Sequence, residues 1–420
     1  MLMQRQKYLE RALAFRDTDL VKVVTGVRRC GKSFLLKLVR QHIEAEGKPE
    51  VGFVDINLES RSLGIKNDTE LYNYVKARLS TTGKTYVFID EVQRIIGWHD
   101  VVNSLRVEFD CDLYVTGSNA FLLSGELATY LSGRYVEIKM LPLSFTEFCD
   151  FNGLEFSPDS SLAVDDNGKP RAFDDVFTQW LDWGGMPALA GQDFNQEKHR
   201  QYLSGVYEAV VQRDILSRER NAVQRAIADP DKLRRIVEYL ADTTGRFTST
   251  TKIARALTES GRKTNHSTVG DYIKALEDAY ISYPCPRYDI HGKAVLKTTP
   301  KHYLVDLGLR AFLTGYRSTD TGFAFENAVF LQLLFEGWNV FAGKLYQKEV
   351  DFVANRDGRV IYIQVTQEML AEQTRERELA PLRSIRDNHE KYVVFRQGTY
   401  PPDFDGIRVL SAQDFFLGEH

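Results

Sequence analysis

A chain of 420 residues, 43% of them hydrophobic, is long enough to bury the cores of about two to four domains. The formal net charge of −4 excludes a basic field over the whole protein, so contact with nucleic acid would need a local patch. No apolar run approaches the length of a membrane span, and the N-terminus lacks the apolar core of a signal peptide, so we expect no membrane partner. The four cysteines show no metal-ligand spacing and favour a reduced, cytoplasmic protein.

The most informative stretch follows a helix predicted at residues 4–16. A β-branched run, Val21–Thr25, gives way to the pattern G-x-x-x-x-G-K-S at Gly26–Ser33, and a helical pattern continues from there to residue 45. This order is the context of a phosphate-binding loop, whose backbone N–H groups point at one anion. A glycine-rich turn that only connects a strand to a helix is the alternative.

The chemistry of that loop assigns roles to its residues. We expect Lys32 to be a catalytic residue that bridges the β- and γ-phosphates of a nucleotide, and Ser33 to be a ligand of Mg²⁺. The expected cofactor-binding residues are Gly26, Val27, Arg28, Arg29, Cys30, Gly31, Lys32, Ser33 and Phe34.

A second strand is predicted at 51–57 and a helix at 69–80, before the apolar strand Thr85–Ile89 ends in Asp90 and Glu91. An apolar strand with two terminal carboxylates is typical of a Walker B element. We expect Asp90 to hold the Mg²⁺ shell and Glu91, as a catalytic residue, to orient and deprotonate the attacking water. An acidic pair that merely ends a strand is the alternative.

The strand Leu113–Thr116 ends in Gly117-Ser118-Asn119, where a polar side chain can contact the γ-phosphate or the attacking water. We assign this sensor role to Asn119, with Ser118 and Thr116 as alternatives. Serine and asparagine are also ordinary turn residues, so a plain loop cap is the competing interpretation.

Arg134 opens a fifth predicted strand, Arg134–Ile138, which we expect it to enter from the nucleotide end. There it is a candidate arginine finger, acting in cis or from a neighbouring subunit, and an ion pair at the surface is the alternative. Alternating strands and helices predict an α/β fold: a doubly wound parallel-sheet P-loop NTPase with its site at the carboxyl ends of the strands.

Beyond this core, residues 151–225 read as a linker and a helical lid. The segment from Asp150 to Pro170 is rich in Asn, Gly, Ser, Asp and Pro, which favour loops. Helical patterns at 173–183 and 195–219 follow, separated by a turn that contains Gly184-Gly185-Met186-Pro187. Arg213 lies where a lid arginine could reach a nucleotide, but an ion pair between lid and core is favoured.

Residues 226–315 read as a winged helix-turn-helix, with three helices followed by β-like segments. In a DNA-binding protein the third helix, which starts near Ser267, would read the base pairs. Its Lys274 is offset by Asp271, Glu277 and Asp278, which is a meagre charge for phosphate binding. A structural or protein-docking role is therefore favoured over DNA reading.

Residues 316–420 read as a small α/β domain with Glu326 on a helix and Asp351 and Gln364 on adjacent strands. This layout resembles a PD-(D/E)XK nuclease core, in which acidic or amide oxygens bind Mg²⁺ and a lysine orients water. Here Gln364 replaces the second acid and Thr366 stands at the lysine position, so the set Glu326, Asp351 and Gln364 describes a degenerate nuclease site. Lys348 is a candidate substitute for the lysine, and binding without cleavage is favoured.

The whole chain resembles a family of bacterial and archaeal AAA+-type P-loop ATPases with a C-terminal winged-helix and nuclease-like domain of unknown function. The motifs that carry the resemblance are Gly26–Ser33, Phe88–Glu91, Thr116–Asn119, Leu131–Arg134, Leu141–Phe145, Gly184–Pro187 and Glu349–Phe352. The resemblance implies ATP as the nucleotide, and the chain has no Asn-Lys-x-Asp sequence for reading guanine. It implies no established substrate.

The leading hypothesis is therefore an ATP-binding, Mg²⁺-dependent ATPase that acts as a switch or motor, with core, lid, winged helix and nuclease-like domain at 1–150, 151–225, 226–315 and 316–420. The first alternative is an ATP-gated DNA-binding protein or nuclease, and the second is a nucleotide-stabilised, non-catalytic adaptor. The partner, DNA or protein, would bind the winged-helix and C-terminal domains, and Arg134 would acquire a role in trans only in a homo-oligomer.

Overall fold

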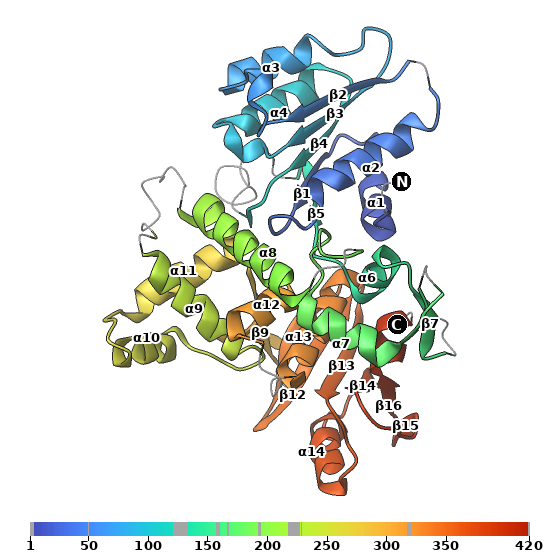
Figure 1. The fold of residues 1–420 in the computed structure, drawn as a ribbon, viewed down its shortest axis with the longest axis vertical. Coiled ribbons are helices and arrows are strands. Elements are labelled where there is room, and N and C mark those ends of the chain that lie inside the picture. The colour runs from blue at the N-terminus through green and yellow to red at the C-terminus, as the bar shows by residue number, and fades with distance from the viewer. Residues whose placement is uncertain are drawn as a thin grey trace. The chain divides into compact units, whose positions relative to one another are not determined.

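The computed structural model describes residues 4–48, 50–120, 131, 133–156, 160–165, 168–191, 195–216, 227, 229–316 and 321–418 (Figure 1). Two compact units are present, Met1–Leu141 with Asp278–Tyr280, and Pro142–Glu277 with Ile281–His420. The N-terminal segment of the first unit ends at Leu141, and the boundary at residue 150 stays a prediction. Within the described residues no helix combines the length and the apolar character that a membrane crossing needs.

The first unit is built on a parallel sheet of five strands in the order β2-β3-β4-β1-β5. The strands are β1 (Val21–Thr25), β2 (Gly52–Asn57), β3 (Thr85–Asp90), β4 (Cys111–Thr116) and β5 (Tyr135–Lys139). Because all five run in the same direction, their carboxyl ends meet at one edge of the sheet. The pairs Val24↔Thr116 and Asn57↔Asp90 place four of these ends side by side. The predicted α/β class and parallel sheet are confirmed.

Helices cover this sheet because their apolar faces match its buried β-branched side chains. The helices are α1 (Gln6–Leu13), α2 (Lys32–Glu44), α3 (Asp68–Lys76) and α4 (Trp98–Glu108), with short 3₁₀ turns η1 (Arg61–Leu63) and η2 (Val92–Arg94). Leu71 of α3 and Leu105 of α4 join one core with Val54, Ile56 and Val87 of the strands. Helix α2 packs against β3 and β4, with α1 beside it.

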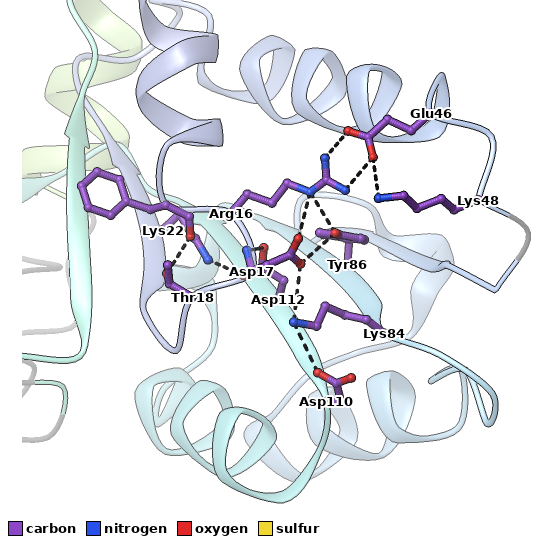
Figure 2. A network of polar contacts seen from close by, with 11 residues as sticks. Arg16, Asp17, Thr18, Lys22, Glu46, Lys48, Lys84, Tyr86, Asp110 and Asp112 are labelled. Carbon is purple, nitrogen blue, oxygen red and sulfur yellow. Dashed lines mark hydrogen bonds and ion pairs between the residues drawn. The ribbon is translucent and has the colours of Figure 1, made fainter.

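The amino-end edge of the same sheet carries a polar network (Figure 2). Lys22 of β1 and Asp112 of β4 form an ion pair in which both side chains are buried. Burial lowers the pKa of the Lys22 ammonium, while the Asp112 carboxylate raises it. Asp112 also accepts a hydrogen bond from Asp17 N at 3.1 Å, and Asp17 accepts one from the Tyr86 hydroxyl at 2.8 Å. This network fastens the segment before β1 to the edge opposite the phosphate loop.

The second unit begins with α6 (Phe145–Phe151), which Ser144 and Glu147 cap reciprocally. Part of the predicted linker forms an antiparallel sheet of β6 (Glu155–Phe156), β7 (Leu162–Val164) and β8 (Pro170–Ala172), so the linker prediction is wrong for these segments. Then follow α7 (Phe173–Trp183), α8 (Gln196–Ala209) and a π-helical turn, η4 (Val210–Leu216).

The Gly184–Pro187 motif has a structural explanation within this unit. Asp306, the N-cap of α12 (Leu307–Thr314), accepts hydrogen bonds from Gly185 N and Leu309 N, both at 2.7 Å. A Cβ atom on Gly184 would lie 2.4 Å from Asp306 Oδ1, and Gly184 has a φ of 79°. Only glycine fits this approach of the α7 terminus to the α12 cap.

The three helices predicted in the middle of the chain are present as α9 (Pro230–Asp242), α10 (Thr250–Glu259) and α11 (His266–Asp278). The β-like segments after them are longer than predicted: β9 (Ser282–Asp289) and β10 (Ala294–Leu304) pair antiparallel. The element order is the one expected for a winged helix.

One sheet then continues into the C-terminal part, in the order β10-β9-β11-β12-β13-β14-β16-β15. Its further strands are β11 (Asn339–Leu345), β12 (Lys348–Arg356), β13 (Arg359–Thr366), β14 (Glu390–Phe395), β15 (Asp403–Phe404) and β16 (Ile407–Ser411). Helices α13 (Thr321–Glu336), α14 (Glu372–Arg383) and α15 (Ala412–Leu417) accompany them. Because β9 pairs in parallel with β11, the boundary predicted between 315 and 316 does not separate two sheets.

Candidate functional site

The phosphate loop curls at the carboxyl end of β1, and its glycines allow the curl. Gly26 has a φ of 139° and Gly31 a φ of 105°, in the region that favours glycine. A Cβ atom on Gly26 would lie 2.1 Å from the carbonyl oxygen of Met140, so the loop passes directly over the residues after β5. Phe34, the last residue of the predicted set, is 55% exposed.

Lys32 is buried at the start of α2. Its ammonium group donates hydrogen bonds to the carbonyl oxygens of Gly26 and Val27, at 2.9 and 3.0 Å. The charged end of the side chain therefore lies on the loop itself, within reach of any anion that the loop amides bind.

Two residues that sequence analysis did not single out support the loop and the segment after β5: Arg5, the N-cap of α1, and Tyr8 within that helix. Arg5 is buried, and its guanidinium donates hydrogen bonds to the carbonyl oxygens of Cys30 and Leu141, both at 2.9 Å. The Tyr8 hydroxyl accepts one from Leu141 N at 3.0 Å. One arginine thus joins the loop to the last residue of the first unit. The sequence offers no signal for these contacts beyond a charged residue at the start of an amphipathic helix.

The two predicted carboxylates lie where three strands end. Asp90 is 6% exposed, and its two oxygens accept hydrogen bonds from the Thr116 hydroxyl at 2.5 Å and the Asn57 amide at 3.1 Å. Thr116 also accepts a hydrogen bond from Glu91 N at 3.0 Å, and Gly117 N donates to Val24 O at 3.1 Å. These contacts connect the ends of β1, β4, β3 and β2 into one polar edge.

Glu91 is 8% exposed and has a left-handed backbone, with a φ of 60°. This conformation is uncommon for a residue other than glycine, and such residues cluster at functional sites. A guanidinium nitrogen of Arg28, from the phosphate loop, lies 3.9 Å from Glu91 Oε2, and the side-chain amide nitrogen of Gln93 lies 2.5 Å from the same oxygen. The structure thus brings the loop and the second carboxylate together.

The three sensor candidates are all buried at the carboxyl end of β4: Thr116 is its last residue, and Ser118 and Asn119 follow it. Thr116 contacts Asp90 and Glu91 directly, as described, and Ser118 Oγ lies 3.4 Å from the Gln93 amide nitrogen. Asn119 is 4% exposed. Residues 121–130, which follow, lie outside the described part of the chain. The sensor role of Asn119 stays a prediction, and Thr116 is the alternative that hydrogen-bonds to both Asp90 and Glu91.

Arg134 does not enter its strand from the nucleotide end. Its carbonyl oxygen accepts a hydrogen bond from Val21 N at 2.9 Å, and the next residue, Tyr135, pairs with Val21 at the amino end of β1. The phosphate loop follows the other end of β1. The exposed Arg134 therefore lies at the opposite edge of the sheet, which leaves only a role toward a neighbouring subunit as a prediction. Ser132 of the same motif lies outside the described residues.

Ser33 and Asp90 are the predicted ligands of a Mg²⁺ ion. Among the residues that the structure describes, no group of three or more His, Cys, Asp or Glu side chains is arranged to hold a metal. The hydroxyl of Ser33 and the carboxylate of Asp90 are hard oxygen donors of the kind Mg²⁺ accepts, and Mg²⁺ at such sites takes its other ligands from water and nucleotide phosphates. These two residues fit a Mg²⁺ ion that arrives with its nucleotide.

The predicted C-terminal set also comes together, around an unpredicted lysine. Lys301 of β10 is 1% exposed, and its ammonium lies 3.1 Å from Glu326 Oε1, 2.6 Å from Glu349 Oε1 and 3.8 Å from Asp351 Oδ1. Burial lowers the pKa of this ammonium, but the three carboxylates raise it more, so it stays charged. Burial raises the pKa of the Asp351 carboxyl, and the charge of Glu326 raises it further.

Gln364 and Lys348 of the predicted nuclease site both have hydrogen-bond partners. Gln364 Oε1 accepts a hydrogen bond from Asp351 N at 3.4 Å, and the Gln364 amide nitrogen donates one to Glu378 at 3.1 Å. Lys348 donates to Ala380 O at 3.2 Å and Ser384 Oγ at 2.6 Å on α14, so it does not substitute for the missing lysine. The cation beside Asp351 comes from Lys301 instead.

Two family models match separate parts of this chain. Residues 18–149 match a family model described as an AAA domain, and residues 174–320 match one described as a domain of unknown function. The first match contains the phosphate loop, both carboxylates and all five strands of the parallel sheet.

Two relatives cover nearly the whole chain. An uncharacterized protein of Haemophilus influenzae is 35% identical over 418 residues, 99% of this chain and 99% of its own length. The uncharacterized protein MJ1544 of Methanocaldococcus jannaschii is 30% identical over 404 residues, 94% of this chain and 85% of its own length. Among solved structures, the Walker-type ATPase PABY2304 of Pyrococcus abyssi aligns with a TM-score of 0.46 at 13% identity, over 74% of this chain and 96% of that one.

Proposed function

This chain belongs to the same family as those two full-length relatives, with an AAA domain at its N-terminal end, and from that premise we propose that it is an ATPase that binds ATP with Mg²⁺ and hydrolyses it. The observation that carries the proposal is the meeting of the phosphate loop with the Asp90–Glu91 pair. Arg28 of the loop lies 3.9 Å from Glu91, and Thr116 joins both acidic residues. A loop that only connected a strand to a helix would need neither carboxylate.

Each residue of this edge has a task in the proposed reaction. The loop amides and Lys32 bind the phosphates, and Lys32 exchanges its two carbonyl acceptors for charged phosphate oxygens, which form stronger hydrogen bonds. Ser33 and Asp90 would hold Mg²⁺, which when bound would neutralise charge on the nucleotide phosphates. Glu91 orients the attacking water and accepts its proton. Asn119 senses the γ-phosphate.

Replacement of Glu91 with Gln tests the assignment of the base. The amide has the same shape but cannot accept the proton, so we expect ATP binding to persist and phosphate release to fall by about 100-fold or more. Glu44→Gln, on the exposed side of α2, is a matched control that should leave both unchanged. Phosphate release by Glu91→Gln at the wild-type rate would remove Glu91 from the mechanism.

The second unit supplies the part on which ATP turnover acts, and we propose that it contains a winged helix at α9–β10. Three helices followed by an antiparallel hairpin support this assignment. Asp271 and Glu277, both half-buried on α11, offset the exposed Lys274, whereas Asp278 is buried. This charge favours a protein partner over DNA, since a DNA-binding face needs an excess of Lys and Arg. The nucleotide state would then move a docking unit, as in a switch.

A DNA-processing ATPase is the second candidate, and the cluster of Glu326, Glu349 and Asp351 around Lys301, with Gln364 beside Asp351, favours it. Lys301 places a charged lysine beside these carboxylates, whereas the motif position for that lysine is occupied by Thr366. Cleavage of plasmid DNA with Mg²⁺ or Mn²⁺ that is lost in Asp351→Ala would support it. DNA left intact by the wild type under both ions would favour a domain retained for binding.

An adaptor that binds nucleotide without turnover would be stabilised by ATP and release no phosphate.

A further inference from the structure

Gln93 lies between two strand ends of the proposed hydrolysis site. It is the middle residue of η2 (Val92–Arg94), the turn that directly follows Glu91. Its side-chain amide nitrogen donates a hydrogen bond to Glu91 Oε2 at 2.5 Å and lies 3.4 Å from Ser118 Oγ. One neutral side chain therefore connects the carboxylate at the end of β3 with the segment after β4.

The Glu91 carboxylate needs such a contact, because its backbone is fixed but its side chain has rotatable bonds. The left-handed backbone and the hydrogen bond from Glu91 N to Thr116 set where the side chain starts. At the other end, Arg28 lies 3.9 Å from Oε2, a distance that allows charge attraction but not a hydrogen bond. Gln93 supplies a short, directional contact to the same oxygen.

The orientation of the Gln93 amide is also informative. Its oxygen is buried and has no hydrogen-bond partner among the described residues. A buried acceptor without a partner is unfavourable, so a side chain selected for folding alone would satisfy both ends of its amide. Gln93 satisfies the end that faces Glu91. A reversed amide would set its oxygen against the negatively charged carboxylate.

We propose that Gln93 is a positioning residue for ATP hydrolysis: its N–H group holds the Glu91 carboxylate in the orientation from which it accepts the proton of the attacking water. The inference rests on the proposed ATPase function and extends it to a residue outside the Walker motifs. In this role Gln93 acts through Glu91. Its removal should therefore lower the rate of the chemical step and leave nucleotide affinity unchanged.

Steady-state phosphate release and the affinity for a fluorescent ATP analogue, both on the full chain, test the proposal. For Gln93→Ala we expect kcat to fall about 10-fold or more, as for the loss of a hydrogen bond to a charged group, with KM and analogue affinity within about twofold of the wild type. Gln93→Glu fills the same space but replaces the N–H donor with an acceptor, so we expect at least as large a loss. Gln41→Ala, on the exposed side of α2, makes the same chemical change away from the site and should match the wild type.

The outcomes separate the role of Gln93 from the proposed function. If Gln93→Glu keeps wild-type turnover while Gln93→Ala loses it, the side chain fills space and the positioning role is wrong. Unchanged or increased turnover in both variants also overturns it. Should Gln93→Ala unfold at the assay temperature, Gln93→Asn serves in its place, because its shorter side chain withdraws the amide from Glu91 and should lower kcat likewise. A wild-type chain that binds ATP and releases no phosphate overturns the ATPase proposal itself, before any variant is compared.

Discussion

Thr116 offers the most direct test of how the polar edge of the sheet is held together. Its hydroxyl donates to Asp90 at 2.5 Å and accepts from Glu91 N at 3.0 Å, and the side chain is fully buried. Thr116→Val keeps the shape and removes both contacts. A hydrogen bond to a charged group contributes about 1.5–3 kcal/mol, and a buried N–H left without an acceptor costs about 1–3 kcal/mol. We therefore expect Thr116→Val to destabilise this region by about 3–5 kcal/mol.

Thr116→Ser is the matched control, because it keeps the hydroxyl and removes one methyl group, at a cost of about 1 kcal/mol. Hydrogen exchange followed by mass spectrometry on peptides that cover 85–91 and 111–117 measures the local free energy of opening in the full chain. We expect the loss in the valine variant to exceed that in the serine variant by about 2 kcal/mol or more. Equal losses in the two variants would refute the assignment of the hydroxyl as the link between β3 and β4.

Three further substitutions test contacts that are local to each unit. Arg5→Met removes a charged donor from two backbone carbonyls. We therefore expect thermal unfolding of the first unit to begin at a lower temperature and the affinity for an ATP analogue to fall. Unchanged affinity would mean that the loop does not need this support. Lys301→Met leaves the Glu326, Glu349 and Asp351 carboxylates without their shared cation. We expect the free energy of unfolding in urea to fall by about 3–5 kcal/mol. An unaltered urea midpoint would contradict the ion cluster. Burial raises the pKa of the Asp306 carboxyl to about 6, so folding favours its protonated form. This preference adds about 3 kcal/mol to the free energy of unfolding, which is fully present below about pH 4 and is lost as the pH rises through 6. Asp306→Asn should abolish this part of the pH dependence of unfolding, and an identical pH profile in the variant would show that Asp306 does not titrate in this range.

The sequence was most informative where a local pattern carries the chemistry. The strand, loop and helix around Gly26–Ser33 and the apolar strand that ends in Asp90 could be predicted because periodicity and glycine placement act over a few residues. The glycines Gly184 and Gly185 could be noticed from the sequence but not explained, since their partner, Asp306, lies far along the chain.

What the sequence could not supply are pairings between distant segments. The buried Lys22 sits in an otherwise apolar strand, and only the fold shows that Asp112 neutralises it (Figure 2). The cation of the C-terminal cluster was sought at Lys348, the nearest lysine in sequence, whereas Lys301 reaches it because β9 and β10 join the sheet of β11–β16. Arg134 was assigned to the wrong edge because strand order and register are set by tertiary packing.

The measurement that tests the central proposal most directly is phosphate release from ATP and Mg²⁺ by the full chain and by Lys32→Ala, each with and without DNA. Lys37→Ala, a lysine on the exposed side of the same helix, is the matched control. The proposal predicts turnover in the wild type and in Lys37→Ala, and loss of turnover in Lys32→Ala. Turnover that rises with DNA would identify the partner as nucleic acid, and turnover that is unaffected by DNA would favour a protein partner. Turnover that persists undiminished in Lys32→Ala, or no turnover by the wild type under any of these conditions, would contradict it.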